Sequence, residues 1–453
     1  MRDLRSRRRQ PGRSLTTALD AIARQEEIAL RILIANLNRN LVGGTEKYLR
    51  DLIPGLQARG HAVALVYECA ADAKAEQIDP PTVPSWCVAG LGVQETLRSI
   101  AKWEPDIVYS HGLDNASLEN GLLAGYPNIM YAHTYYGTCV SGTKCHVTPR
   151  VQPCERRFGA PCLLLYYPRR CGGLNPRTMW QMFRAQSERK SRFARYGAIL
   201  VASRHMRHEF ANHGVAPDQL RLVRLPLGGA APAPLPAPRI PGGRILFLGR
   251  LVDVKGAHYL IRALPKAAAK LGRPLSLTVA GDGPQRAKLQ ALAHQLQLTV
   301  DFAGWVGAEE KLALMRRADV LAVPSLWPEP FGLVGIEAGH VGLPAVGYAL
   351  GGIPDWLIPG ESGESASGAP PSIDGLADAL VKALADPDHY GKLCQGAWRV
   401  AGQFTLESHL DELQAILAAV QGKSAPPRFR GEPAPAEQLR NLESEHPMEY
   451  HKP

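Results

Sequence analysis

Hydrophobic residues occur along the chain in short runs of Ile, Val and Leu that alternate with longer stretches of helical or loop character. Strands buried on both faces of a parallel sheet have this composition, because helices cover the sheet from both sides. The pattern predicts strands at RILIANL (31–37), AVALVYE (62–68), DIVYSHG (106–112), NIMYAHT (128–134), AILVAS (198–203), RILFLGR (244–250), LSLTVAGDG (275–283), VDFAGWV (300–306), VLAVPS (320–325) and PAVGYAL (344–350).

A proline-rich segment, GGAAPAPLPAPRIPGG, interrupts the alternation and indicates a stiff linker, because it can form neither a helix nor a central strand. We expect an α/β protein of two Rossmann-like, doubly wound domains that face each other across a deep cleft, with ligands at the carboxyl ends of the strands. The predicted parts are a disordered basic arm (1–28), a first domain (29–228), the linker (229–242), a second domain (243–404), a terminal helix (405–421) and a disordered tail (422–453).

Composition and charge exclude several functional classes. A chain of 453 residues is too long for one ordinary domain, and no apolar run is long enough to cross a bilayer. The segment after the Arg-rich N-terminus is too charged for a signal peptide, so we expect a cytoplasmic protein. Much of the net charge of +10 lies in the N-terminal arm, which we expect to be solvated or to touch the inner face of the membrane. Because no DNA-binding motif accompanies this charge, nucleic acid is not an expected partner.

Paired glycines, Gly43 and Gly44, follow the first predicted strand and precede a predicted helix that Thr45 can cap. The apolar face of this helix would consist of Tyr48, Leu49, Leu52, Ile53 and Leu56. Glycines at a helix start let backbone N–H groups approach an anion, although a tight turn between strand and helix is the simpler explanation. Neither a Walker A loop nor G-x-G-x-x-G is present.

Two basic residues, Arg250 and Lys255, follow the first strand of the second domain within GRLVDVKG. Arg can grip a phosphate with two parallel hydrogen bonds and Lys adds a mobile point charge, which suits a diphosphate. Basic loop residues are usually only solvated. The position of this pair at a strand end, flanked by glycines, makes a phosphate-binding role about as strongly indicated as a solvated loop.

Glu329 and Glu337 stand eight positions apart in WPEPFGLVGIEAGHVGLP, where a helix is expected to start near Gly332. Eight helical residues advance by roughly 12 Å, so the two carboxylates are not expected to converge on one atom. This separation disfavours a glycosidase pair or a shared metal ion. It favours two contacts on one elongated ligand, with the helix start between them free to receive phosphate. A pair of surface glutamates is the alternative.

The string EPFGLVGIE resembles the E-x7-E motif of glycosyltransferase family 4, whose members are retaining enzymes of GT-B fold. Other family elements that the sequence resembles, in order and spacing, are GG (43–44), GH (60–61), PDIVYSHG (105–112), AHT (132–134), GRLVDVKG (249–256), AGDGP (280–284), FAGWV (302–306) and GGIPD (351–355). The resemblance covers roughly residues 30–420. Asp355 departs from the glutamate that is common at its position, and His340 from a small residue.

The resemblance implies roles for the matching residues. Glu329 would contact hydroxyls of the donor sugar and Glu337 the nucleotide ribose, while Arg250 and Lys255 would neutralise the diphosphate leaving group. His133 would lie beside the reacting carbon; on sequence alone it would more often be a structural histidine at a strand end, and the match at AHT favours the functional role. The remaining donor-binding positions that it implies are Gly43, Gly44, Phe331, Gly332, Leu333 and Val334.

Five of the eight cysteines lie in the segment after His133, at Cys139, Cys145, Cys154, Cys162 and Cys171. A structural zinc site is disfavoured, because zinc usually takes at least one close C-x2–4-C pair and this segment has none. Cytoplasmic cysteines stay reduced, so free structural thiols are favoured over a disulfide staple or a redox-sensitive lid on the acceptor side. No metal ligand is predicted, and the resemblance implies metal-independent transfer.

We therefore expect a retaining glycosyltransferase that moves a sugar from a nucleoside-diphosphate sugar to a hydroxyl of a glycan or lipid-linked acceptor. Cell-surface polysaccharide or glycolipid synthesis is the expected setting. Two alternatives stay open. One is a nucleotide-sugar epimerase of the same fold, which would rearrange the donor without an acceptor, and the other is a nucleotide-sugar-binding protein without catalysis.

Overall fold

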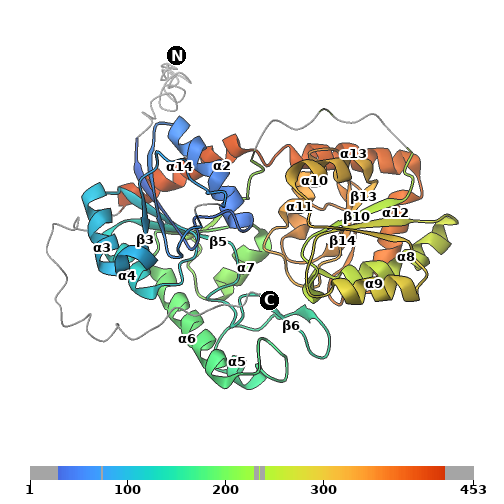
Figure 1. Ribbon diagram of the computed structural model, residues 1–453, viewed down its shortest axis with the longest axis horizontal. Coiled ribbons are helices and arrows are strands. Elements are labelled where there is room, and N and C mark those ends of the chain that lie inside the picture. Colours follow the sequence, from blue (N-terminus) through green and yellow to red (C-terminus); the bar gives the residue numbers. More distant parts are fainter. Residues whose placement is uncertain (1–28, 73–74, 229–233, 235–239, 424–453) are drawn as a thin grey trace, which may run out of the picture.

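The computed structural model describes residues 29–72, 75–228, 234 and 240–423, which form two α/β domains side by side (Figure 1). The expectations for the arm (1–28), for most of the linker (229–242) and for the tail beyond residue 423 lie outside these residues. Within the described ranges, no helix is both long and apolar enough to cross a bilayer.

The first domain is built on a seven-stranded parallel sheet whose strands come from residues 31–222. Its strands, in spatial order, are β3 (Ser85–Cys87), β2 (Ala62–Tyr67), β1 (Arg31–Asn36), β4 (Ile107–Ser110), β5 (Asn128–Ala132), β8 (Ala198–Val201) and β9 (Leu220–Leu222). Its helices are α2 (Gly44–Ala58), α3 (Val88–Trp103), α4 (Ala116–Gly125), α5 (Pro161–Leu165), α6 (Pro176–Arg192), the 3-10 turn η1 (Phe193–Arg195) and α7 (Arg204–Asn212).

The second domain has a six-stranded parallel sheet from residues 244–367. Its spatial order is β12 (Val300–Gly304), β11 (Ser276–Ala280), β10 (Arg244–Leu248), β13 (Val320–Val323), β14 (Ala345–Ala349) and β15 (Gly363–Ser367). Its helices are η2 (Asp253–Lys255), α8 (Ala257–Leu271), α9 (Arg286–Gln295), α10 (Ala308–Arg317), α11 (Leu333–Gly339), η3 (Ile353–Asp355), α12 (Ile373–Leu384) and α13 (Pro387–Ala401).

The central strand β1 shows why the hydrophobic runs predict buried parallel strands. Ile32 and Ile34 belong to the hydrophobic core on one face of the sheet, whereas Leu33 and Ala35 belong to the core on the other face. Because successive side chains point to opposite faces, a strand covered on both sides needs apolar residues at every position. The expected α/β architecture of two parallel sheets is confirmed.

Helix α2 has the predicted apolar face but a different start. All five predicted face residues, Tyr48, Leu49, Leu52, Ile53 and Leu56, are buried. The prediction that Thr45 caps the helix is wrong, because the helix begins at Gly44 and the capping position is Gly43, which has an extended backbone and no side chain to bond. The acidic Glu46 in the first turn supplies the favourable charge at this helix start instead.

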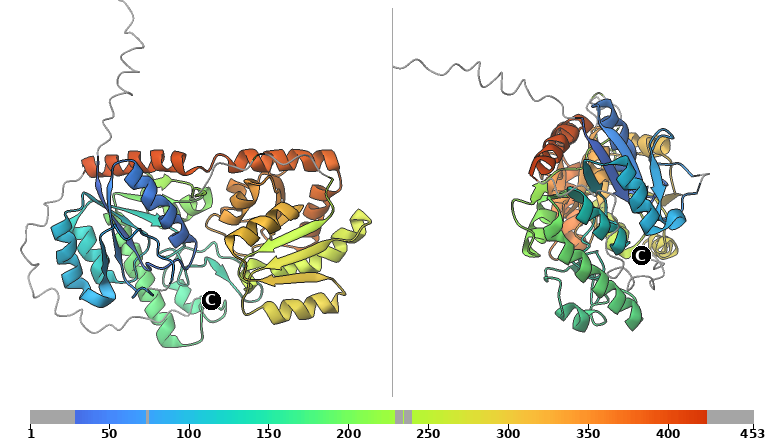
Figure 2. Two further views of the ribbon diagram at one scale, coloured as in Figure 1. Left: turned by 45° about the horizontal axis from the view of Figure 1, so that its top comes forward. Right: turned by 90° about the vertical axis from the view of Figure 1, so that its left-hand side faces the viewer.

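The terminal helix α14 (Leu406–Lys423) returns to the first domain, where it packs on α2 and β5. Figure 2 shows α13 and α14 end to end along the molecule, with α13 on the second domain and α14 on the first. The helix extends two residues past the expected end at 421. Where the chain crosses back, Leu227 forms a parallel β-bridge with Thr405, and its backbone N–H donates to the carbonyl of Phe404 at 2.9 Å.

Residues 138–184, here called the cysteine lobe, extend from the first domain below its sheet (Figure 1). The lobe contains the two-stranded antiparallel pair β6 (Cys145–His146) and β7 (Gln152–Pro153), helix α5 and the first half of α6. A small hydrophobic core of its own, centred on Val140, Phe158 and Tyr166, holds it together.

Candidate active site

Glu329 lies on the loop between β13 and α11, and its carboxylate is buried and fixed by three donors. Its Oε1 accepts hydrogen bonds from Lys255 Nζ at 2.6 Å, Ser325 Oγ at 2.6 Å and Trp327 Nε1 at 3.0 Å. Its Oε2 accepts no hydrogen bond from a residue that the structure describes. The structure thus joins two residues that the sequence singled out separately, and it leaves one carboxylate oxygen open to a ligand.

Two glycine-containing loops hold Glu329 in this position because neither has room for a side chain. Gly256, which has a φ of 72°, lies so close to the loop that a Cβ would stand 1.9 Å from the carbonyl oxygen of Pro324. At Gly351 a Cβ would stand 2.5 Å from the backbone of Glu329, and Gly352 N–H donates to the Glu329 carbonyl at 2.7 Å. The glycines of GRLVDVKG and GGIPD therefore have a physical reason, which is close backbone packing around one carboxylate.

Glu337 lies on α11 and has a separate set of partners. Its Oε1 accepts from Lys47 Nζ of the first domain at 2.6 Å and from Lys311 Nζ of α10 at 2.8 Å. Burial alone would raise the pKa of Glu337, but the two ammonium groups outweigh it and hold the pKa below its usual range. As the eight-residue spacing predicted, the two glutamates share no hydrogen-bond partner.

Helix α11 begins one residue after Gly332, as expected. Gly332 has a φ of 88°, which favours glycine, and the ring of Trp356 lies 3.4 Å from where its Cβ would be. Leu333 and Val334 are partly buried against the core. The Phe331 ring is buried against Phe404, so a donor could meet Phe331 only through its backbone.

His133 follows β5 and forms a hydrogen bond with a second histidine. Its Nε2 lies 3.0 Å from Nδ1 of His111, which follows β4, and its ring stacks on Tyr131 with ring centroids 4.7 Å apart. Burial lowers the pKa of His133 to about 3, so the imidazole is neutral. Burial, followed by repulsion from His133 and His409, also lowers the pKa of His111 well below its usual value.

Two other predicted site residues, Arg250 and Gly44, have no fixed side-chain partner among the described residues. Arg250 is exposed just beyond β10, and its guanidinium bonds to no residue in the described part of the chain. Gly44 is exposed, and a Cβ added to it would meet no atom within 4 Å. The structure joins neither Arg250 nor His133 to the remaining predicted residues by a hydrogen bond.

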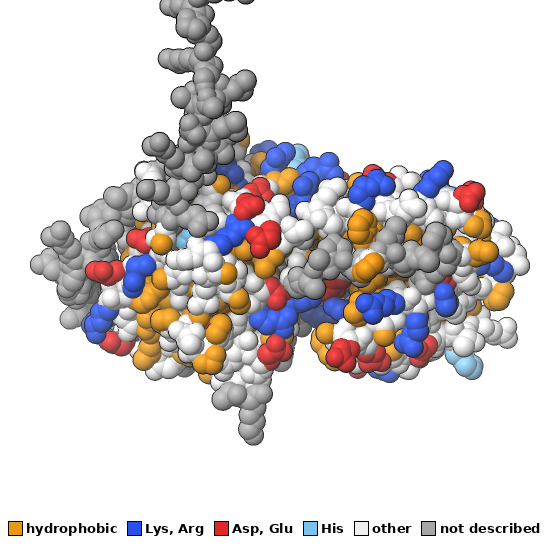
Figure 3. All heavy atoms as spheres, turned by 90° about the horizontal axis from the view of Figure 1, so that it is seen from above, with side chains coloured by type: hydrophobic (Ala, Val, Ile, Leu, Met, Phe, Trp, Pro, Cys, Tyr) orange, Lys and Arg blue, Asp and Glu red, His pale blue; other side chains and the backbone are white. Residues whose placement is uncertain are grey.

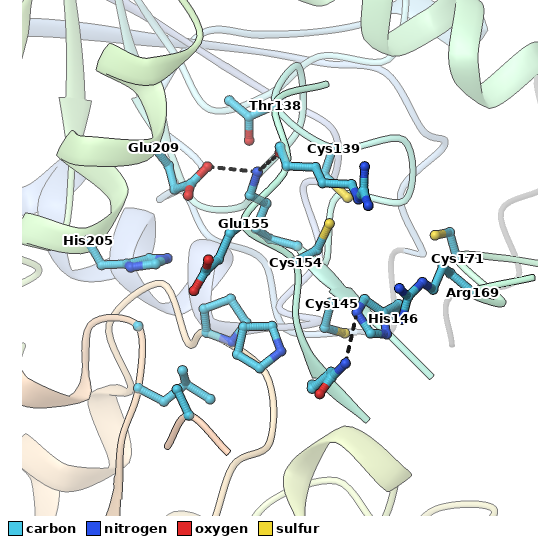
Figure 4. A pocket seen from close by; sticks show the side chains of 18 of the residues that line it. Thr138, Cys139, Cys145, His146, Cys154, Glu155, Arg169, Cys171, His205 and Glu209 are labelled. Carbon is cyan, nitrogen blue, oxygen red and sulfur yellow. Dashed lines mark hydrogen bonds and ion pairs between the residues drawn. The ribbon is translucent and has the colours of Figure 1, made fainter. Parts of the chain in front are cut away.

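A cavity of about 980 Å³ lies between the cysteine lobe and the second domain (Figure 4). Residues that line it include all five clustered cysteines, His205 and Glu209 of α7, and Pro328, Gly351 and Pro354 beside the Glu329 loop. The five clustered cysteines form no disulfide with one another, and burial raises the pKa of Cys145 to about 11 and that of Cys171 to about 12. Among the described residues, no three His, Cys, Asp or Glu side chains are arranged to hold a metal ion.

Among the polar atoms near this cavity that lack a hydrogen-bond partner in the described part of the chain, two belong to neighbouring rings. They are the hydroxyl of Tyr135, two residues beyond His133, and Nε2 of His205. The two rings meet edge to face with centroids 5.9 Å apart. Burial, followed by the charges of Glu209 and Glu329, raises the pKa of Tyr135. An unsatisfied buried polar group is costly, so these atoms are candidates for ligand contacts.

Several residues of the site escaped the sequence prediction. Lys47 was missed because its partner, Glu337, lies 290 residues away in the chain, and Lys311 was missed because it belongs to none of the recognised motifs. His111 lies in the string PDIVYSHG, and its position at a strand end beside that of His133 was an available signal. Asp355, noted only as a departure from glutamate, accepts from the backbone and side chain of Arg204 across the domain junction.

Both halves of the chain match known families. Residues 42–226 match the family described as Glycosyltransferase Family 4, and residues 241–397 match Glycosyl transferases group 1. The sequence is 27% identical over 410 residues to a glycogen synthase of Mycobacterium tuberculosis, an alignment that covers 85% of this chain and 94% of the relative.

Two solved structures are similar in fold. Anabaena HepE, in complex with UDP and glucose, superposes with a TM-score of 0.60 at 16% identity and covers 86% of this chain and 100% of its own. The lipopolysaccharide outer core galactosyltransferase WaaB, in its apo form, gives a TM-score of 0.60 at 15% identity and covers 86% and 99%. With this fold and these matches, the protein is a glycosyltransferase of GT-B fold. It belongs to glycosyltransferase family 4, whose enzymes transfer a sugar from a nucleotide sugar.

Proposed function

We propose that this enzyme is a retaining hexosyltransferase that uses a nucleoside-diphosphate hexose and a glycan or lipid-linked acceptor in cell-surface polysaccharide or glycolipid synthesis. The observation that carries the proposal is a pair of carboxylates with separate lysine partners: Glu329 is held by Lys255, and Glu337 by Lys47 and Lys311. UDP-hexoses are the first donors to test, because the similar Anabaena structure holds UDP and glucose. The lipopolysaccharide galactosyltransferase among the similar structures motivates the choice of acceptor class.

The two carboxylates would bind opposite ends of the donor. The open Oε2 of Glu329 is suited to accept hydrogen bonds from sugar hydroxyls, while the hydrogen bond from Lys255 holds the carboxylate in its orientation. Glu337 is ionised beside Lys47 and Lys311 and would accept from the ribose hydroxyls. Glu329 thus orients the sugar and stabilises charge, and the acceptor would attack from the face that the diphosphate leaves.

Positive groups near the diphosphate would stabilise its departure. The Arg250 guanidinium bonds to no described residue and Lys255 lies beside the Glu329 carboxylate, so both could approach the leaving phosphates. Gly44 has open space where a side chain would stand, so its backbone N–H can approach phosphate closely. Fixed positive groups placed where negative charge develops lower the barrier to bond cleavage.

The acceptor would bind from the side of the cysteine lobe. The cavity there is bordered by the Glu329 loop, and the free polar atoms of Tyr135 and His205 are suited to bind acceptor hydroxyls. His133 is neutral, so it would contribute a hydrogen bond near the reacting carbon rather than a charge.

The proposal is tested with the purified protein and UDP-, GDP- and ADP-hexoses, with and without acceptors from cell extract. We expect release of nucleoside diphosphate from one donor, transfer to an acceptor, and a product with the anomeric configuration of the donor by NMR. Rearrangement of the donor sugar without acceptor would indicate an epimerase. Tight binding without any turnover would indicate a non-catalytic protein, and an inverted product would disprove retention.

Glu329→Gln gives a narrower test of the site. We expect kcat to fall by about a hundredfold or more, because the substitution removes the charge that orients and stabilises the sugar. The matched control is Glu361→Gln, at a partly exposed glutamate that pairs with Arg399 on the surface of the same domain. Unchanged kcat in a folded Glu329→Gln enzyme would refute the role assigned to this residue.

A further inference from the structure

The cysteine lobe carries three large apolar side chains that are more than half exposed to water. Leu164 on α5 is 81% exposed, Leu174 between α5 and α6 is 73% exposed, and Trp180 in the first turns of α6 is 57% exposed. Single exposed hydrophobic residues are common on protein surfaces. Three within one short segment that has its own small core indicate a surface that is covered when the protein works.

The lobe is also strongly basic. Residues 138–184 contain seven arginines and one lysine against a single glutamate, Glu155. The lysine is buried and paired with Glu209 at 2.9 Å, so it does not contribute to the surface charge. The exposed arginines that form no ion pair with any described carboxylate are Arg150, Arg156, Arg157, Arg170 and Arg177. On the face seen from above in Figure 3, by contrast, basic and acidic side chains are interspersed.

We propose that the cysteine lobe is the surface by which this enzyme binds an anionic lipid bilayer. Such a bilayer offers both of the environments that the lobe requires, because Leu164, Leu174 and Trp180 can enter the boundary of the acyl chains while the arginines meet lipid phosphates. A nucleic acid would neutralise the arginines but leave the apolar side chains in water. A second copy of the chain would place two lobes of like charge against each other.

The cavity beside the lobe suggests what membrane binding would achieve. This step rests on the proposed function, in which the acceptor is lipid-linked. Cys162, Leu165 and Arg169 line the cavity, whereas their sequence neighbours Leu164 and Arg170 are exposed. The lobe therefore lies between the outer surface and the cavity that borders the Glu329 loop. A lipid-linked acceptor held in a bilayer at the lobe would have its head group on the side from which the cavity is reached, with Arg169 available to its phosphate.

Vesicle binding tests the proposal without any turnover. The full-length protein is sedimented with vesicles of phosphatidylcholine alone and with vesicles that also contain phosphatidylglycerol. We expect binding only to the anionic vesicles. The triple variant Leu164→Ser, Leu174→Ser and Trp180→Ser, and separately the double variant Arg170→Glu and Arg177→Glu, should each lower the partition coefficient by about tenfold or more. The basic N-terminal arm is unchanged in both variants, so the loss is assigned to the lobe.

Trp305→Ser is the matched control, because Trp305 is 81% exposed on the second domain. It should bind vesicles like the wild type. The proposal would be overturned if both lobe variants bound anionic vesicles as well as the wild type does. It would also be overturned if Trp305→Ser lost as much binding as the lobe variants. A change of molecular mass in the lobe variants without vesicles would show instead that the lobe contacts a second copy. Hydrolysis of the nucleotide-sugar donor, measured without lipid, should be unchanged in both lobe variants. A failure of the membrane proposal can therefore be distinguished from a failure of the proposed function.

Discussion

His133 is a neutral imidazole whose orientation is set by His111. One proton is shared in the bond between His111 Nδ1 and His133 Nε2, and His111 Nε2 is buried without a partner among the described residues. A buried N–H without a partner is rarer in proteins than a bare acceptor. His111 is therefore expected to donate from Nδ1. His133 then carries its own proton on Nδ1 and can donate it to a ligand.

Replacing His111 with Phe should reduce catalysis without emptying the donor site. The variant retains the ring volume but loses the donor that orients His133, so we expect kcat to fall about tenfold to a hundredfold while KM for the donor changes little. Nitrogen NMR of His133 should show loss of the preferred tautomer. His208→Phe, at an exposed histidine of α7, is the control. Wild-type kcat in a folded His111→Phe enzyme would rule out this positioning role.

Site residues differ in how far the sequence could reveal them. Glu329 and Lys255 lie in local motifs with distinctive glycines and prolines, so they were recognised as candidates although their mutual bond was not. The contact between Lys47 and Glu337 depends on the relative orientation of two domains, which no local pattern encodes. Nothing near Lys47 in the sequence distinguishes it from a solvated surface lysine.

At the scale of elements, one buried histidine is among the contacts that fix α14 to the first domain, together with the polar contacts of Arg59 and His61. His409 Nδ1 lies 2.9 Å from the carbonyl of Arg224, and its Nε2 lies 2.8 Å from the hydroxyl of Tyr48 on α2. Burial, only partly offset by the hydrogen bond to Arg224, lowers the pKa of His409 to about 4. The helix is therefore held by an uncharged imidazole.

This arrangement predicts loss of stability in mild acid. The unfolded chain takes up a proton on His409 near pH 6.5, whereas the folded chain does so only near pH 4. Protons therefore favour the unfolded state below pH 6.5, and His409 should lower the free energy of unfolding by about 2 kcal/mol between pH 7 and pH 5. Urea unfolding at both pH values measures this. His409→Asn should reduce the difference by a similar amount, and a variant with the wild-type difference would contradict the assignment.

Elements with a regular pattern were predictable and irregular ones were not. The strands of both sheets have apolar runs that need burial on two faces, so their positions follow from composition alone. The start of α2 was misplaced because Thr45 is a better capping residue than glycine, yet the chain enters the helix through the extended Gly43. The cysteine lobe has short elements and a small separate core. Elements this short contain too few residues to show a helical or strand periodicity, so the sequence did not predict them.

At the scale of the whole molecule, two ion pairs connect the domains across their junction. Lys47 contacts Glu337, and Arg204 contacts the nearly buried Asp355 with a bond of 2.7 Å from its Nε. The basic side chain of each pair, Lys47 or Arg204, is partly exposed to water. Each ion pair therefore contributes at most about 1 kcal/mol to the free energy that holds the domains together. Together they bias the domains toward the closed arrangement without locking it.

Removing both pairs should open the molecule. In the double variant Lys47→Ala and Arg204→Ala we expect a larger radius of gyration by small-angle X-ray scattering without ligand, because a bias of this size shifts a two-state equilibrium several-fold. Lys270→Ala, which removes an ion pair within the second domain, should leave the scattering unchanged. A double variant as compact as the wild type would show that other contacts hold the domains together.

The bridge between Leu227 and Thr405 constrains how such an opening can take place. The described chain leaves the first domain just after one of these residues and re-enters it beside the other, and the two crossings are hydrogen-bonded to each other. Two connections that run side by side and are bonded to each other act as a hinge rather than as a flexible linker. The two domains can rotate apart and twist slightly about this hinge, but they cannot slide past each other. Each closure would therefore return Glu337 to Lys47 in the same register, so the donor half and the acceptor half of the site would meet in one alignment.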